Sequence, residues 1–139
     1  MAASKTYVQI VKPAVKDIFD TKHKSRVIEK MQKAAEKAVK DSGKLTLDAP
    51  KEKGATGFSI DTSLVSLAPD KAGKKLEGKC SMSISTWPGK SIKAMPSGTA
   101  ALAISGADKI DAGDVDAVAE GAVESAMKSA TKYMEQNAS

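Results

Sequence analysis

The chain contains few of the residues on which enzyme sites depend. Its 139 residues include one cysteine, Cys80, and one histidine, His23. A single cysteine excludes an intramolecular disulfide and any multi-cysteine metal site. One histidine gives no basis for a first-row metal site or a hydrolytic triad, and neither a P-loop nor a dinucleotide-binding glycine pattern is present. The sequence therefore predicts a protein that is not an enzyme, with no catalytic, cofactor-binding or metal-binding residues.

Aromatic residues and long apolar runs are also scarce. Aromatics make up 4% of the chain, so its core must consist of Val, Ile, Leu, Met and Ala, with little surface for stacking bases or sugars. No apolar run reaches the roughly 18 residues of a membrane span. The first ten residues show no export signal. We expect one domain over residues 1–139 with residues 1–5 disordered, located in the periplasm or cell envelope if a signal peptide was trimmed, and otherwise in the cytoplasm.

The net charge of +5 is unevenly distributed. Residues 1–54 carry 13 basic and 7 acidic side chains, whereas residues 107–139 carry 3 basic and 7 acidic ones. One interpretation is an anionic partner such as nucleic acid or lipid headgroups. The other, which we favour, is a solvated lysine-rich face beside an acidic one.

Alternating apolar residues predict the strands. A strand at residues 6–12 should stop at Pro13, and a brief one is expected at residues 44–49. In residues 58–67 and 76–86 apolar side chains recur at every second position, and serines occupy the opposite side of the second segment. A face lined with serine meets water, so the sheet should be mainly antiparallel and covered on one side only.

Two segments have the 3.6-residue period of amphipathic helices. The first begins near Ser25, has an apolar stripe from Val27 to Val39, and should stop at Gly43. The second has an unbroken stripe from Val115 to Met134, capped by Asp114 or Asp111. These elements predict an α+β fold, a two-layer sandwich of a mainly antiparallel four- to five-stranded sheet with two helices on one face, in the order β-α-β-β-β-α.

Residues 86–98 join the serine-faced strand to a final strand near residues 99–105. Pro88 and Pro96 lack backbone donors, so a looped hairpin connection explains this segment without any function. The alternative is an exposed cationic and apolar lip that binds a partner, since Trp and Met are common interface anchors. Its candidate partner-binding residues are Trp87, Lys90, Ile92, Lys93 and Met95.

Three other features have structural interpretations. Cys80 lies on the apolar side of its strand and is expected to be a buried thiol. His23 lies in the basic segment DTKHKSR and is expected at the surface. The acidic segment at residues 108–116 lacks the oxygen spacing and closing glutamate of an EF-hand loop, so helix capping explains it better than calcium binding.

A family resemblance rests on the order of elements and on three segments: the strand from Gly57 to Leu67, the charged turn at residues 70–75 and the Trp-Pro-Gly-Lys corner at residues 87–90. At the level of pattern, residues 6–135 resemble α+β domains of bacterial envelope proteins: the LpoB-type lipoprotein activators, the curli-secretion proteins and TolB N-terminal domains. This resemblance implies a non-enzymatic periplasmic or outer-membrane-associated domain that binds a protein partner.

Two functional hypotheses follow. The first is an envelope accessory domain that binds a protein or self-associates, for example through an exposed sheet edge. The second is a protein that binds nucleic acid or an anionic surface through the basic residues of its first helical region, which are Lys22, Lys24, Arg26, Lys30, Lys33, Lys37 and Lys40. The few aromatics and the acids among these lysines favour the first hypothesis.

Overall fold

A computed structural model describes residues 5–51, 54–89 and 91–137. Most of the segment expected to be disordered, residues 1–4, lies outside this range. The elements, in chain order, are β1 (Thr6–Ile10), β2 (Ala14–Val15), the 3-10 turn η1 (Thr21–His23), α1 (Lys24–Asp41), β3 (Leu45–Thr46), β4 (Gly57–Pro69), β5 (Lys75–Trp87), β6 (Ile92–Ala94), β7 (Ser97–Ala103), the 3-10 turn η2 (Ala107–Lys109) and α2 (Ala112–Asn137).

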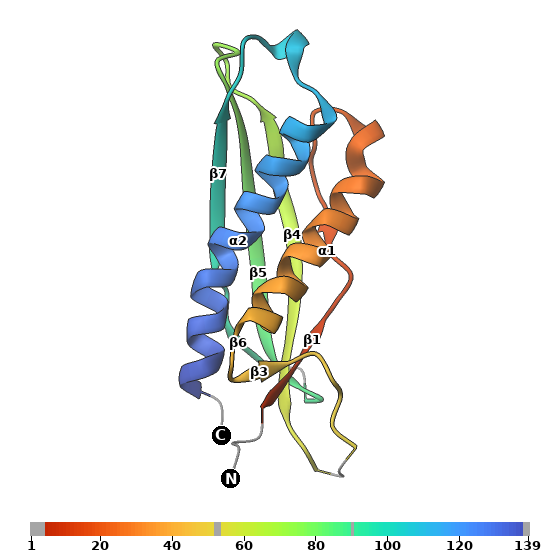
Figure 1. The fold of residues 1–139 in the computed structure, drawn as a ribbon, viewed down its shortest axis with the longest axis vertical. Helices are drawn as coiled ribbons and strands as arrows, with labels where there is room; N and C mark the ends of the chain where they lie inside the picture. Colours follow the sequence, from red (N-terminus) through yellow and green to blue (C-terminus); the bar gives the residue numbers. More distant parts are fainter. Residues whose placement is uncertain (1–4, 52–53, 90, 138–139) are drawn as a thin grey trace.

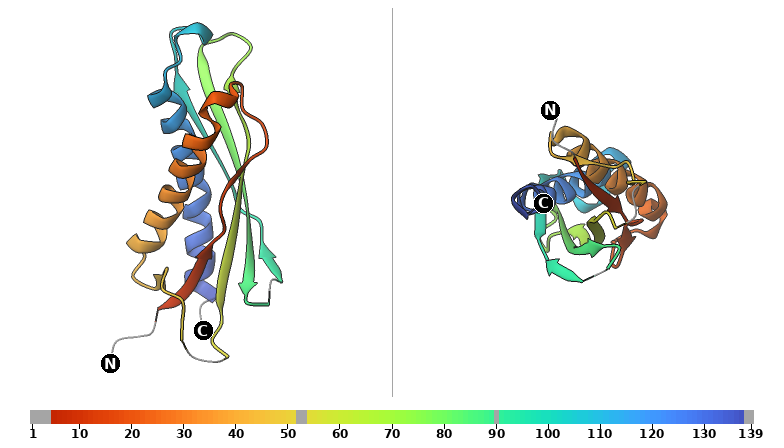
Figure 2. Two further views of the ribbon diagram at one scale, coloured as in Figure 1. Left: turned by 90° about the vertical axis from the view of Figure 1, so that its right-hand side faces the viewer. Right: turned by 90° about the horizontal axis from the view of Figure 1, so that it is seen from below.

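Two long antiparallel strands, β4 and β5, form the centre of the sheet. On one side β1 and β2 pair with β4 in parallel, and β3 pairs in parallel with β1. On the other side β6 and β7 pair with β5 in antiparallel fashion. Both helices cover the same face of this curled sheet and run in the same direction (Figures 1 and 2). The predicted α+β fold with two helices on one face is confirmed, and the sheet is mixed because its N-terminal strands are parallel.

Prolines divide each outer part of the sheet into two pieces. β1 and β2 lie along the same side of β4, and Pro13, which has no N–H to donate, lies between them. β6 and β7 lie along the same side of β5, and Pro96 separates them. The short strands β2 and β6 were not expected from the sequence, which assigned both segments to connections. Pro88 and Pro96 are indeed kept out of the central ladders.

The alternation of β5 is as predicted. Leu76, Cys80 and Ile84 are buried, whereas Glu77 and Lys79 are exposed and Ser81, Ser83 and Ser85 are partly exposed on the other face. β4 alternates from Phe58 to Leu64, and then a bulge between Leu64 and Ser66 shifts the register. Because the bulge adds one residue, Leu67 returns to the buried side. The serine-lined face therefore stays in contact with water, as expected.

Both helices bury the predicted apolar stripes. α1 ends at Asp41, close to the stop predicted at Gly43: Ser42 adopts an extended conformation, and Gly43 has no left-handed backbone. The Ser42 hydroxyl instead donates a hydrogen bond of 2.6 Å to Glu135 of α2. Neither helix in the described part of the chain combines the length and apolar content that crossing a membrane requires.

Glycines allow α2 to lie very close to the sheet. A Cβ atom added at Gly98 of β7 would lie 2.4 Å from both the carbonyl oxygen of Ala122 and the amide nitrogen of Ala126. One added at Gly78 of β5 would lie 2.7 Å from Val118. Contacts this short are possible only without a side chain, so these two glycines set the distance between α2 and the strands beneath it.

Candidate interaction surface

The structure brings most of the predicted lip to one end of the sheet. Ile92 and Lys93 lie on β6, Met95 follows it, and all three are exposed. Ile92 is 60% exposed and Met95 67%, more than any other large hydrophobic side chain of the described residues. Lys90 lies outside the described residues. Two apolar side chains and one lysine are thus available to a partner, and partner binding by the lip remains a prediction.

Trp87 is positioned differently from the rest of the lip. Its ring is partly buried and contacts Tyr7 edge-on, with ring centroids 4.7 Å apart and planes at 77°. The sheet register explains the contact, because Gly57 of β4 pairs with Tyr7 on one side and Trp87 on the other. Gly57 has no side chain to separate the two rings. Trp87 therefore has a structural role at the end of β5, and sequence analysis did not identify Tyr7 as its partner.

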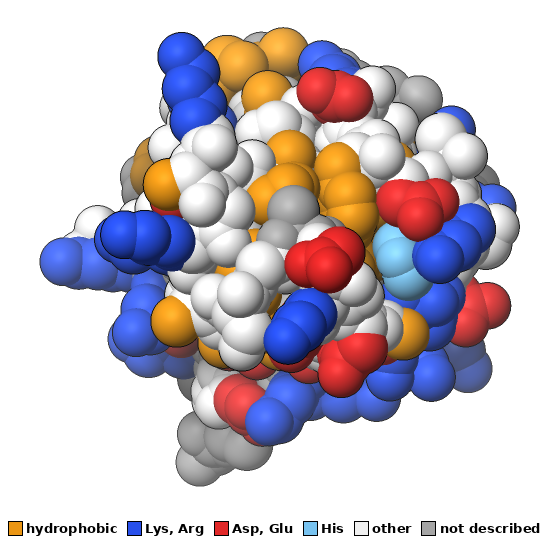
Figure 3. Space-filling view, turned by 90° about the horizontal axis from the view of Figure 1, so that it is seen from above, with side chains coloured by type: hydrophobic (Ala, Val, Ile, Leu, Met, Phe, Trp, Pro, Cys, Tyr) orange, Lys and Arg blue, Asp and Glu red, His pale blue; other side chains and the backbone are white. Residues whose placement is uncertain are grey.

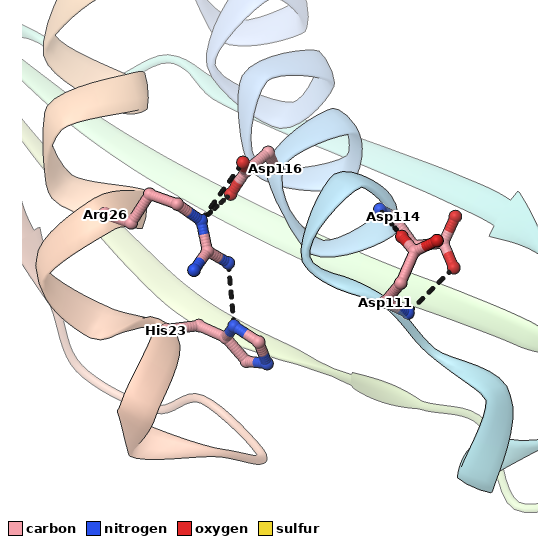
Figure 4. A network of polar contacts seen from close by, with 5 residues as sticks. All are labelled: His23, Arg26, Asp111, Asp114 and Asp116. Atoms are coloured by element: carbon pink, nitrogen blue, oxygen red, sulfur yellow. Dashed lines mark hydrogen bonds and ion pairs between the residues drawn. The ribbon is translucent and has the colours of Figure 1, made fainter.

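His23 is buried, with 6% of its surface exposed, so the expectation of a surface histidine was wrong. Arg26 explains its position. The Arg26 guanidinium makes a hydrogen bond of 2.7 Å with Nδ1 of His23 and an ion pair of 2.8 Å with Asp116 of α2 (Figure 4). The ring of Phe19 lies 6.0 Å from the imidazole, centroid to centroid. These contacts join the first turn of α1 to the first turns of α2.

The same end of the molecule carries the cap of α2. Asp111 accepts a hydrogen bond of 2.8 Å from the N–H of Asp114, and Asp114 accepts one of 3.1 Å from the N–H of Asp111 (Figure 4). This reciprocal arrangement is a capping box, so both aspartates predicted as capping residues take part. Seen from this end, the histidine lies beside a strip of hydrophobic side chains bordered by charged residues (Figure 3). Within the described ranges, no three His, Cys, Asp or Glu residues are close enough to hold a metal ion.

Cys80 and Thr62 carry reactive or polar groups but have no exposed surface. Cys80 is fully buried as predicted, and burial raises the pKa of its thiol to about 12, which makes it a poor nucleophile. Thr62 of β4 is fully buried as well, and its hydroxyl has no hydrogen-bond partner within the part of the chain that the structure describes. Neither residue lines an opening to solvent, so neither is available to a ligand.

Acidic side chains lie close to several basic residues of the first helical region. Lys33, Lys37 and Lys40 are exposed on α1, but Arg26 is engaged with Asp116. A shallow depression between the helices, about 190 Å³ in volume, has lysines on one wall and glutamates on the other; it is lined by Lys30, Lys33, Ala34, Lys37, Glu120 and Glu124. The potential over this groove is therefore mixed, which suits a polyanion poorly.

Comparison with known proteins shows similarity of fold. Neither the models of known protein families nor the sequences of curated proteins match this chain. Among solved structures, a Xanthomonas campestris protein of the DUF330 family matches with a TM-score of 0.62 and 14% identity over 97% of this chain and 86% of its own. A putative lipoprotein from Caulobacter crescentus matches with a TM-score of 0.53 and 8% identity over 93% of this chain and 88% of its own.

A protein from Paraburkholderia phytofirmans, PelC, solved as a dodecamer, also shares the fold. Its TM-score is 0.53 at 9% identity, over 89% of this chain and 88% of its own. These identities are too low to transfer a function, but the coverage shows that the fold is shared along nearly the whole chain. The resemblance inferred from the sequence is confirmed at this coarser level, since a solved protein described as a putative lipoprotein has this fold. None of these three structures is described as being of the LpoB, curli-secretion or TolB type.

Proposed function

We propose that this chain is a non-enzymatic domain of a bacterial cell-envelope protein that acts by associating with protein, in the first instance with further copies of itself. The observation that carries the proposal is the shared fold, because two of the similar structures are described as a putative lipoprotein and as a PelC dodecamer.

The side chains support a binding role over a catalytic one. The single histidine is buried and held by Arg26, and the single cysteine is buried with a raised pKa. A general base or nucleophile needs access to substrate and a pKa near the working pH, and Cys80 has neither. The lip, in contrast, exposes Ile92 and Met95 with a lysine between them.

Two measurements test the proposal. Sedimentation velocity of the purified chain should show a species larger than the monomer that grows with concentration. Fractionation of the cells that naturally produce the protein should recover it with the envelope. A chain that stays monomeric at all concentrations and is recovered with the cytosol would overturn the proposal.

The contribution of the lip can be measured without disturbing the fold. Ile92→Ser and Met95→Ser change side chains that are 60% and 67% exposed, so they should leave stability unchanged. If the lip binds a partner protein, the double variant should reduce its capture from envelope extracts. Trp87→Ala is a less selective test because it also removes the contact with Tyr7. Undiminished capture by the double variant would remove the lip from the proposal.

Binding to nucleic acid or another polyanion is the alternative. The exposed lysines of α1 favour it, and the glutamates that share their groove oppose it. Phosphate contacts would make such binding steeply dependent on salt. Filter binding of single- and double-stranded nucleic acid at low and high salt distinguishes this alternative from the envelope proposal, and we expect no retention of nucleic acid even at low salt.

A further inference from the structure

The side of β5 away from β4 ends in an open strand edge. Within the described ranges β7 pairs with β5 alone, and it forms an outer border of the sheet in Figure 1. Two hydrogen bonds define its orientation: the N–H of Met82 donates to Pro96, and the N–H of Ile104 donates to Lys74, both at 2.9 Å.

These bonds show which backbone N–H and C=O groups of β7 point away from β5. In an antiparallel ladder alternate residues bond to the neighbouring strand, and the residues between them direct their N–H and C=O groups the other way. With Cys80 opposite Gly98, the residues bonded to β5 are Gly98, Ala100 and Leu102. The residues that face the open edge are Ser97, Thr99, Ala101 and Ala103.

Nothing in this strand blocks pairing with another strand. All four edge-facing residues are exposed, and their side chains are small and uncharged. Natural proteins usually protect such edges with lysines, prolines, bulges or very short strands, and the seven residues of β7 contain none of these. The opposite side of the sheet is protected, because β3 has two residues and Pro13 interrupts β1 and β2 between the exposed Lys12 and Lys16.

We propose that β7 pairs antiparallel with β7 of a second copy about a two-fold axis, so that the two sheets become continuous. This inference rests on the self-association proposed above and assigns it to a surface. A two-fold axis places the same strand opposite itself. Small, uncharged side chains then face one another, and no like charges meet across the new ladder. The backbone groups of the four edge-facing residues supply the hydrogen bonds.

Two variants test this assignment. Ala101→Pro removes an edge-facing donor while leaving the ladder with β5 intact, which is the arrangement in which strands tolerate proline. Thr99→Lys places like charges near one another across the two-fold interface. Ser83→Lys is the matched control, since it adds the same charge to the same outer face on the central strand β5, opposite Asp61. Circular dichroism and urea unfolding verify that each variant is folded.

Sedimentation velocity of the purified proteins provides the result. We expect Ala101→Pro and Thr99→Lys to weaken self-association at least about tenfold and Ser83→Lys to leave it within about twofold of wild type. If the wild-type chain associates and the folded edge variants associate equally well, the edge assignment is wrong and self-association stands. If the wild-type chain stays monomeric, both are wrong. If assemblies grow without a defined dimer step, head-to-tail pairing replaces the two-fold interface.

Discussion

Replacing Gly98 by alanine tests the close contact between α2 and the edge of the sheet. The added Cβ would lie 2.4 Å from the Ala122 oxygen and the Ala126 nitrogen. Ordinary contacts of this kind begin at 3.4 Å, so the helix and β7 must separate by about 1 Å. Overpacking of this type costs about 1–3 kcal/mol, and we expect about 3 kcal/mol because the obstructing atoms are helix backbone.

The assay is urea unfolding followed by circular dichroism, and two other glycines are its controls. Gly121→Ala places a Cβ at 3.0 Å from the Cβ of Ala100, a mild conflict that the better helix propensity of alanine offsets. We expect a change within about 1 kcal/mol of zero. Gly43→Ala has no atom within 4 Å and no left-handed backbone, so it should stabilise the fold by about 0.4–1 kcal/mol. If all three variants unfold at the same urea concentration, the close approach of α2 to β7 is refuted.

Three further predictions concern polar groups. Thr62→Val should raise the free energy of unfolding by about 1 kcal/mol, because it removes a buried hydroxyl that has no partner in the described residues; a loss of stability in urea would contradict this. Burial raises the pKa of the Cys80 thiol to about 12 against an ordinary 9.0, so the native thiol should resist alkylation at pH 8; rapid labelling of the native protein would contradict its burial. The free energy of unfolding should also fall as the pH rises from about 9 towards 12, because the thiol of the unfolded chain loses its proton at a lower pH than the native thiol does. Asp116→Asn should lower the free energy of unfolding by about 1 kcal/mol at low salt and by less at high salt, since the ion pair with Arg26 is partly exposed. A loss of stability that does not depend on salt would show that packing rather than charge explains the effect.

The fold could be predicted because each main element has a single buried side. Alternation located β4 and β5, and the 3.6-residue period located both helices. Period alone could not reveal β2 and β6, since strands of two and three residues contain too little alternation to detect. The bulge after Leu64 was also not detectable, because Val65 and Ser66 are compatible with a regular strand.

The surroundings of single residues were less predictable than the elements. The segment around His23 is charged and has no period, so sequence analysis placed the histidine at the surface. Its burial depends on Arg26, which is held in turn by Asp116 from a helix 90 residues further along the chain. Trp87 shows the same limitation, since its contact with Tyr7 arises from the pairing of three strands.

The distribution of charge and hydroxyl groups restricts where a partner can bind. The outer face of β4 and β5 is lined with partly exposed serines, so covering it would gain little apolar contact. The groove between the helices has both lysines and glutamates, so neither an acidic nor a basic partner complements it. The open edge of β7 and the lip both lie along the same side of β5, separated by Pro96. The β7 edge consists of the backbone groups of Ser97, Thr99, Ala101 and Ala103, whereas the lip exposes the side chains of Ile92 and Met95. Pairing at β7 and binding at the lip should therefore be separable, with Ala101→Pro impairing the first and the Ile92 and Met95 substitutions impairing the second.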